Sequence, residues 1–151
     1  KTFVSAEQAM KSRRATAGDL VVATTSEDDA SVGKAVAWLG DEDVAVSTDA
    51  LIFRHGLDAK YVSYFFQSRG FQDQKAKWIT GTKVRRISGS GLNKIVIPVP
   101  PVNVQNRIVE ILDKFEELVR DLSVGLPAEL NARRRQYEYY RDRLLTFEEA
   151  A

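Results

Sequence analysis

The sequence predicts an α+β fold, with a mixed α/β region over residues 1–101 and a long helical region of coiled-coil type over residues 102–151. The first region holds eight of the nine glycines and most of the β-branched residues, a composition typical of short strands joined by turns. The second region holds one glycine and repeats its apolar residues at helical spacing. Between them, residues 97–101 carry three prolines, which neither a helix nor a central strand accommodates. This segment is the predicted boundary between two domains.

Four short apolar runs indicate strands in the first region, at residues 19–24, 34–39, 43–47 and 51–54. The turn sequence at residues 40–42 predicts that the second and third runs form a hairpin.

Two helices are predicted after these strands. Asp58 precedes a run of helical spacing over residues 59–66 and is expected to cap it, because an aspartate side chain accepts hydrogen bonds from the first free N–H groups of a helix. A second helix is predicted from Gly70 to Trp78. Residues 84–97 then return to a β-type pattern around a turn at residues 88–91.

The helical region carries a heptad pattern, in which apolar residues alternate steps of four and three. The pattern breaks at residues 123–127 and then resumes. Either the helix kinks at this Gly/Pro break or the chain turns back as a helical hairpin. A continuous helix over residues 103–147 would be about 65 Å long, and its apolar stripe would need a partner helix. The residues predicted to contact a partner or a second copy are Ile108, Ile111, Phe115, Leu118, Leu122, Tyr137, Tyr140 and Leu144.

Composition limits the classes of function. The formal net charge of +1 is too small for the overall electrostatic field to attract nucleic acid or membrane. Any such binding needs a local patch of positive charge. The absence of cysteine rules out disulfides and thiolate metal sites and fits a cytoplasmic protein. No apolar run approaches the ~18 residues of a membrane span, and the N-terminal residues lack the apolar core of a signal peptide.

Catalytic signatures are sparse. The single histidine, His55, follows a predicted strand and is interpreted as structural or exposed. The acidic residues 27–29 lack the ligand spacing of a calcium loop, so a solvated loop is favoured. The Ser/Gly segment 88–94 lacks the spacing of a phosphate-binding loop and is read as a turn.

One basic segment stands out, because residues 74–94 contain six basic side chains and no acidic one. The six are Lys75, Lys77, Lys83, Arg85, Arg86 and Lys94. Arginine can bond bidentately to guanine edges or phosphates, and lysine and small hydroxyl residues suit phosphates. The alternative is an ordinary basic surface loop. Residues 133–135 form a second basic cluster, which nearby acidic residues dilute, so a solvated helix face or contact with an acidic partner is favoured there.

Several segments resemble the DNA-specificity subunit of type I restriction-modification systems. The most specific is the proline-rich step into a Gln-x-x-Ile-Val-x-Ile-Leu helix at Gln105. The segments that carry the resemblance are residues 18–21, 24–26, 81–88, 92–101, 104–113, 132–142 and 144–147.

The resemblance implies a DNA-recognition role without catalysis. Residues 1–101 would be a target-recognition domain that reads one half of a bipartite site on double-stranded DNA, and residues 102–151 would be a conserved helical spacer. The spacer would dock methyltransferase subunits, which bind S-adenosylmethionine and methylate adenine; this chain would bind no cofactor or metal. A restriction and translocase subunit would join the complex. Because the family has two recognition domains and two such helices, the chain is expected to be a half-subunit or a fragment that pairs as a homodimer through residues 103–147.

Candidate DNA contacts follow from the basic segment and the resemblance together. Lys83, Arg85 and Arg86 are the main candidates, with Thr82 and Ser88 at phosphates. Thr25, Ser26, Ser47 and Thr48 are further candidates on loops near strand ends. Two other readings stay open at this point: a coiled-coil adaptor without a DNA role, and, less favoured, a nuclease or other enzyme.

Overall fold

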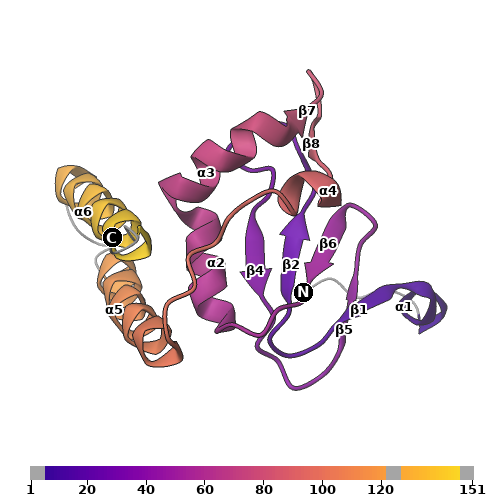
Figure 1. Ribbon diagram of the computed structural model, residues 1–151, viewed down its shortest axis with the longest axis horizontal. Coiled ribbons are helices and arrows are strands. Elements are labelled where there is room, and N and C mark those ends of the chain that lie inside the picture. The colour runs from indigo at the N-terminus through magenta and orange to yellow at the C-terminus, as the bar shows by residue number, and fades with distance from the viewer. Residues whose placement is uncertain (1–5, 122–126, 147–151) are drawn as a thin grey trace.

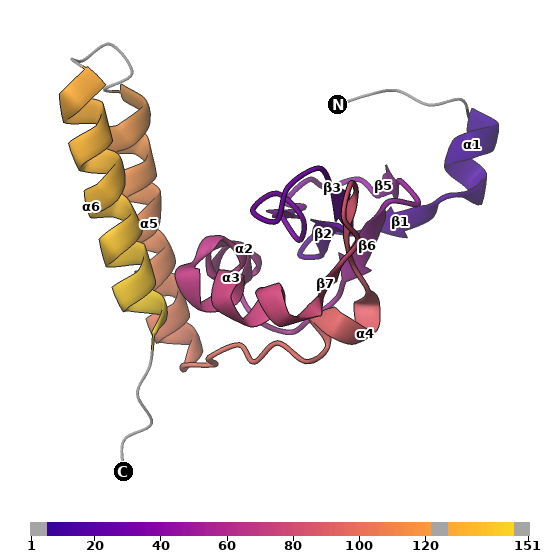
Figure 2. The ribbon, with the colours of Figure 1, turned by 90° about the horizontal axis from the view of Figure 1, so that it is seen from above.

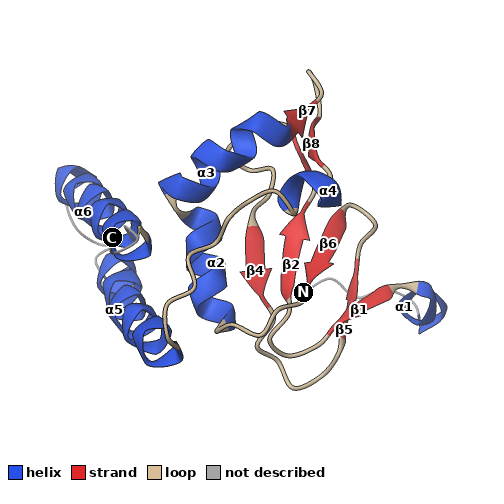
Figure 3. Ribbon diagram, viewed as in Figure 1, coloured by secondary structure: helices blue, strands red, loops and turns tan. Residues whose placement is uncertain are grey.

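The computed structural model describes residues 6–121 and 127–146, and it confirms the α+β class (Figure 1). An α/β body built around small antiparallel sheets is followed by two long helices, as the colouring by secondary structure in Figure 3 shows. In chain order the elements are α1 (Ala6–Lys11), β1 (Arg13–Ala15), β2 (Leu20–Ala23), β3 (Thr25–Ser26), β4 (Ala35–Ala37), β5 (Val44–Val46), β6 (Ala50–Phe53), α2 (Ala59–Gln67), α3 (Arg69–Lys75), the 3₁₀ turn η1 (Ala76–Trp78), β7 (Ile79–Thr80), β8 (Arg85–Ile87), α4 (Gly89–Leu92), α5 (Val102–Asp121) and α6 (Pro127–Leu145).

The central sheet has the order β4-β2-β6, with both pairs antiparallel. Strand β2 lies in the middle and alternates buried with half-buried side chains, Leu20 and Val22 being fully buried. This alternation is the period-2 pattern of a strand with one face on a core. All four predicted strands are present: β2, β4 and β5 are shorter than their apolar runs, and β6 lies one residue earlier than predicted.

The predicted hairpin between residues 34–39 and 43–47 is wrong. Strand β4 pairs with β2, whereas β5 pairs with β1 in a separate two-stranded sheet. Backbone hydrogen bonds between Trp38 and residues 18 and 19, each 2.8 Å long, continue the β2–β4 pairing, and the indole of Trp38 then bonds to the carbonyl of Glu42. The turn therefore leads the chain out of the sheet. Strand β1 and helix α1 were not predicted.

Helix α2 forms the centre of the core. The side chain of Asp58 accepts a hydrogen bond from the backbone N–H of Tyr61 at 2.7 Å, which confirms the predicted cap. Six of its nine residues are buried, because the sheet covers one side of α2 and α5 covers the other. Figure 2 shows α2 and α3 between the strands and the two long helices. The prediction of a second helix from Gly70 to Trp78 corresponds to α3 and η1.

The predicted β-type pattern over residues 84–97 holds only for β8. Residues 89–92 form the short helix α4, which Ser88 caps by accepting a hydrogen bond from the N–H of Gly91. An extended segment without strand pairing then leads to α5. This segment runs along the body, where the hydroxyl of Tyr61 donates a hydrogen bond to the carbonyl of Pro98 at 2.9 Å.

The helical region turns back as a hairpin. Helices α5 and α6 lie side by side and run in opposite directions (Figure 2), and the rings of Phe115 and Tyr140 stack at 5.6 Å between them. Each helix is about 30 Å long at 1.5 Å per residue, half of the length expected for one continuous helix. Leu122, the Gly/Pro break at residues 123–126 and Phe147 lie outside the described residues. The partner helix that the apolar stripe requires is thus in the same chain.

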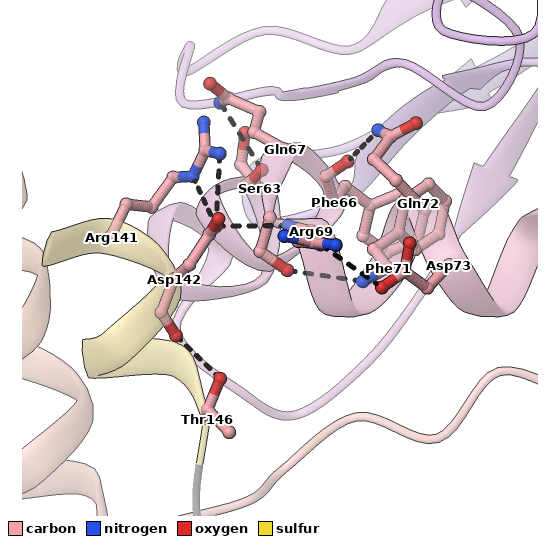
Figure 4. Close-up of polar contacts among 11 residues, drawn as sticks. Ser63, Phe66, Gln67, Arg69, Phe71, Gln72, Asp73, Arg141, Asp142 and Thr146 are labelled. Carbon is pink, nitrogen blue, oxygen red and sulfur yellow. Dashed lines mark hydrogen bonds and ion pairs between the residues drawn. The ribbon is translucent and has the colours of Figure 1, made fainter. Parts of the chain in front are cut away.

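Polar contacts fix the hairpin to the body at two places. On α6, Asp142 accepts a hydrogen bond from the backbone N–H of Arg69 at 3.0 Å, at the start of α3, and is held by Arg141 (Figure 4). A carboxylate is favourable there, because the first N–H groups of a helix lack partners within the helix. On α5, Asp113 accepts hydrogen bonds from Lys60 and Tyr64 of α2.

Candidate nucleic-acid interface

A three-stranded antiparallel sheet of order β3-β8-β7 brings the candidate DNA contacts together. Thr25 lies opposite Arg86 and Ser26 lies opposite Arg85, although about sixty residues separate the two strands in sequence. Thr80 on β7 flanks Arg86 from the other side. Thr25 and Ser26 are therefore in a strand, not in the predicted loop, and the sheet collects hydroxyl and basic side chains in one place.

The tip of the β7–β8 hairpin is exposed throughout residues 81–84, which include the candidates Thr82 and Lys83. Gly81 has φ +91°, and a Cβ built there would lie 2.2 Å from the carbonyl oxygen of Val84. Only glycine fits this turn, because other residues rarely adopt positive φ and the backbone leaves no space. The tip is thus a tight, projecting turn that carries a lysine and a threonine.

Arg85 and Arg86 have different surroundings. Successive side chains of a strand point to opposite faces, so Arg85 shares a face with the buried Ile87, and Arg86 points away from it. The Nε of Arg85 lies 2.8 Å from a carboxylate oxygen of Asp29, and one terminal nitrogen donates to the carbonyl of Gly81 at 2.6 Å. Arg86 is exposed and makes no side-chain hydrogen bond or ion pair with the described part of the chain.

The other candidates lie around this sheet. Ser88 follows β8 directly and is exposed, but its hydroxyl already caps α4. Ser47 and Thr48 lie in the exposed turn between β5 and β6. That turn is joined to the start of β3, because the carbonyl of Asp49 accepts hydrogen bonds from both the backbone and the hydroxyl of Thr24.

Lys75 does not belong to the surface patch that its position in the basic segment suggested. It is 2% exposed, and its ammonium donates to the carbonyls of Ala30 and Val32 and lies over the ring of Phe71. Burial lowers the pKa of Lys75 to about 8, against the opposing effect of nearby Asp28 and Asp29. The exposed basic residues of the segment are Lys77, Lys83, Arg86 and Lys94, with Arg85 half-buried.

Asp29, Trp78 and Gln105 are relevant residues that the sequence reasoning did not single out as contacts. Asp29 bonds to Arg85, and Trp78 is 40% exposed next to β7. Gln105 is 1% exposed and joins three segments: its side chain accepts from the N–H of Asp58 and donates to the carbonyl of Pro100. The sequence signal for this last role is the position of Gln105, four residues after the last proline of the linker and at the start of the Gln-x-x-Ile-Val-x-Ile-Leu motif.

His55 packs against a neighbouring aromatic ring, in a structural rather than a catalytic arrangement. Its ring lies 5.2 Å from that of Phe53, and Nδ1 accepts a hydrogen bond from the N–H of Leu57. Burial lowers the pKa of His55, which favours the neutral imidazole. Among residues 6–121 and 127–146, no group of three acidic or histidine side chains is placed to hold a metal ion. No helix within those ranges has the length and hydropathy needed to cross a membrane.

The residues predicted for helix contacts divide into two groups. Ile108 is buried against the body, and Leu144 and Tyr137 pack against the same core. Ile111 and Phe115 are half-buried, while Leu118 is 54% exposed and Tyr140 is 39% exposed. The stripe is therefore covered at Ile108, Tyr137 and Leu144 and exposed at Leu118 and Tyr140.

Comparison with known proteins identifies the family. The protein-family model for the type I restriction modification DNA specificity domain matches residues 8–132 of this chain. The chain therefore belongs to this family. It is 44% identical over 98 residues to the type I restriction enzyme EcoR124I/EcoR124II specificity subunit of Escherichia coli, covering 65% of this chain and 24% of the relative. It is 38% identical over 99 residues to the EcoprrI specificity subunit of Escherichia coli, covering 61% of this chain and 24% of the relative.

A relative from another organism gives the same assignment. The MpnII specificity subunit of Mycoplasma pneumoniae is 36% identical over 62 residues, covering 41% of this chain and 19% of the relative. The chain spans about a quarter or less of the length of these curated relatives. The family assignment also disfavours a coiled-coil adaptor without a DNA role.

Proposed function

We propose that this chain reads one half of a bipartite target on double-stranded DNA, as the recognition module of a type I restriction-modification complex. The observation that carries the proposal is the β3-β8-β7 sheet, which gathers Thr25, Ser26, Arg85 and Arg86 next to the exposed tip residues Thr82 and Lys83. Membership of the DNA specificity domain family supports it.

The β7–β8 hairpin has the form needed to enter DNA. The major groove of B-DNA admits a two-stranded β-ribbon, and Lys83 and Arg86 project from this ribbon without partners in the described residues. Lysine and arginine side chains that neutralise phosphates release counterions, so binding should weaken as salt is added. We therefore assign Lys83 and Arg86 to phosphate contacts, with Thr82 and Ser88 nearby.

The helical hairpin is proposed as the spacer and docking element. It is fixed to α2 and α3, and it exposes Leu118 on α5 and Tyr139 and Tyr140 on α6. We propose that methyltransferase subunits dock along this hairpin, that a restriction and translocase subunit joins the same assembly, and that a second copy of the chain can pair through it. The chain itself would be non-catalytic, and S-adenosylmethionine would bind only in the methyltransferase.

The test is a gel-shift titration with DNA duplexes that the wild-type chain selects from a randomised library. Replacing both Arg85 and Arg86 with alanine should weaken binding of the selected duplex at least tenfold, because each specific or phosphate contact contributes on the order of 1–3 kcal/mol. The Arg86→Ala change alone should reduce the slope of log affinity against log salt by about one.

The matched control removes two positive charges elsewhere. Arg134 and Arg135 are exposed on α6, away from the sheet, so replacing both with alanine should leave the affinity for the selected duplex nearly unchanged. Equal losses for the two double variants would show that net charge, not the β7–β8 hairpin, governs binding. Unchanged affinity of the Arg85/Arg86 variant would contradict the assignment of these residues.

A further inference from the structure

The guanidinium of Arg85 is held in one orientation before any DNA is bound. Its Nε forms an ion pair with a carboxylate oxygen of Asp29 at 2.8 Å, and one terminal nitrogen donates a hydrogen bond to the carbonyl of Gly81 at 2.6 Å. The side chain is only 35% exposed, so packing restricts it as well. An arginine has five N–H donors in a rigid planar fork, and these two contacts engage Nε and one terminal nitrogen. The other terminal nitrogen makes no hydrogen bond or ion pair with the described residues and remains free to bind a ligand.

The loop that carries Asp29 is itself well anchored. The carboxylate of Asp28 accepts from the N–H of Ser31 at 2.6 Å, and the buried ammonium of Lys75 donates to the carbonyls of Ala30 and Val32. The loop then returns to the central sheet, where the N–H of Gly33 donates to the carbonyl of Ala23. Asp29 therefore lies on a loop whose backbone is tied to the core.

This arrangement disfavours a phosphate at Arg85. A phosphate oxygen that accepted from the same guanidinium would come close to the Asp29 carboxylate, and like charges at such short separation repel each other. The edge of a base carries no formal charge, so the Asp29 carboxylate does not repel it in this way. A planar fork whose orientation is already set also loses less freedom when it forms a bidentate pair with a base such as guanine.

We propose that Asp29 is a positioning residue that directs Arg85 to a base edge, so that the Asp29–Arg85 pair contributes to sequence specificity while Arg86 and Lys83 bind phosphates. This inference rests on the proposed DNA-reading function. It divides the two adjacent arginines of β8 into one that reads sequence and one that binds the backbone.

The experiment compares the full wild-type chain with the Asp29→Asn variant, using a randomised library of DNA duplexes as the probe. The selected duplex and a scrambled duplex are then titrated over a salt series. Asp29→Asn should lower the ratio of specific to non-specific affinity about tenfold, with an unchanged salt slope. The lost preference should lie at the same base pair that Arg85→Lys relaxes, because lysine keeps the charge but lacks the planar fork.

Two controls isolate the pair. Asp41→Asn removes the same charge from an exposed loop that follows β4, at the end of the central sheet opposite to β3, and should change neither affinity nor specificity. In an Arg85→Ala background, Asp29→Asn should cause no further loss of specificity, since the residue it positions is absent. Urea unfolding of each variant establishes that the fold is retained.

The outcomes separate this inference from the function on which it rests. If the wild-type chain selects no sequence from the library, both fail. If it selects a sequence but Asp29→Asn leaves the specificity ratio unchanged, the positioning role alone is wrong. It is also wrong if Asp29→Asn strengthens binding to both duplexes equally, because Asp29 would then only compete with phosphates for Arg85.

Discussion

Replacing Asp113 with alanine should loosen the helical hairpin from the α/β body. The carboxylate of Asp113 on α5 accepts hydrogen bonds from the hydroxyl of Tyr64 at 2.7 Å and from the ammonium of Lys60 at 2.5 Å, both on α2. Tyr64 is 5% exposed, and burial together with these acidic neighbours raises its pKa, so the hydroxyl stays protonated and donates. This contact therefore joins α5 of the helical hairpin to α2 of the α/β body.

The cost can be worked out from the two bonds. A hydrogen bond to a charged group contributes about 1.5–3 kcal/mol, and the lower value applies because Tyr64 also donates to Glu116 at 3.1 Å. The Lys60 pair is partly exposed on both sides and adds about 0.5 kcal/mol. The Asp113→Ala variant should therefore lose about 2 kcal/mol of unfolding free energy at pH 7. In urea this corresponds to a midpoint about 1 M lower.

The loss should also depend on pH. Burial acts to raise the pKa of Asp113, but the hydrogen bonds from Lys60 and Tyr64 outweigh it and hold the pKa below 3.8. A carboxylate whose pKa is depressed by folding stabilises the fold above its unfolded pKa and ceases to do so as the pH falls through its folded pKa. The difference between wild type and Asp113→Ala should therefore shrink below pH 4.

The control is Glu110→Ala, which removes an exposed carboxylate from the same helix and should change the unfolding free energy by no more than about 0.5 kcal/mol. The reasoning is refuted if Asp113→Ala and Glu110→Ala behave alike, or if the Asp113→Ala deficit is the same at pH 3 and pH 7.

Two further predictions concern the hairpin tip and the buried lysine. Gly81→Ala should destabilise the fold by about 2 kcal/mol in urea unfolding and weaken DNA binding, because its Cβ would collide with the backbone of Val84. The control is Gly18→Ala, at the same φ of +91° but with open space around it. If both substitutions lower the unfolding free energy equally, strain at positive φ alone is the cause. For Lys75, the lowered pKa of about 8 means that the unfolded state binds more protons between pH 8 and 10.5, so stability should rise with pH there. Wild type should gain roughly 2 kcal/mol relative to Lys75→Met between pH 8 and pH 10 in urea unfolding, and parallel pH profiles of the two proteins would contradict the buried charge.

Local patterns predicted much of the fold. The structure confirms the cap at Asp58, the strand predicted at residues 19–24, the extended proline-rich segment and the start of the long helix, all of which depend on neighbouring residues. The predicted pairing of residues 34–39 with 43–47 failed, because strand pairing depends on partners that are distant in sequence. The division at residues 101 and 102 stays a prediction, since Ile108 and Leu112 share one core with the sheet and α2.

In the candidate site, too, the sequence identified residues but not their contacts. The basic segment drew attention to Lys83, Arg85 and Arg86, but composition could not separate the buried Lys75 from its exposed neighbours. Whether these residues contact DNA stays a prediction. Asp29 could not be linked to Arg85 from sequence, because fifty-six positions separate them and only the β3–β8 pairing brings the two segments together.

The sequence by itself determined the class of fold, the family and the existence of a helical region that needs a partner helix, because periodicity and motifs are properties of neighbouring residues. Only the tertiary structure decided that this partner is α6 of the same chain, that α2 lies between the sheet and the hairpin, and that Arg85 is bound by Asp29 while Arg86 is not. These features arise from burial and pairing between distant segments, where several arrangements satisfy the same local pattern and the packing of the whole chain selects one.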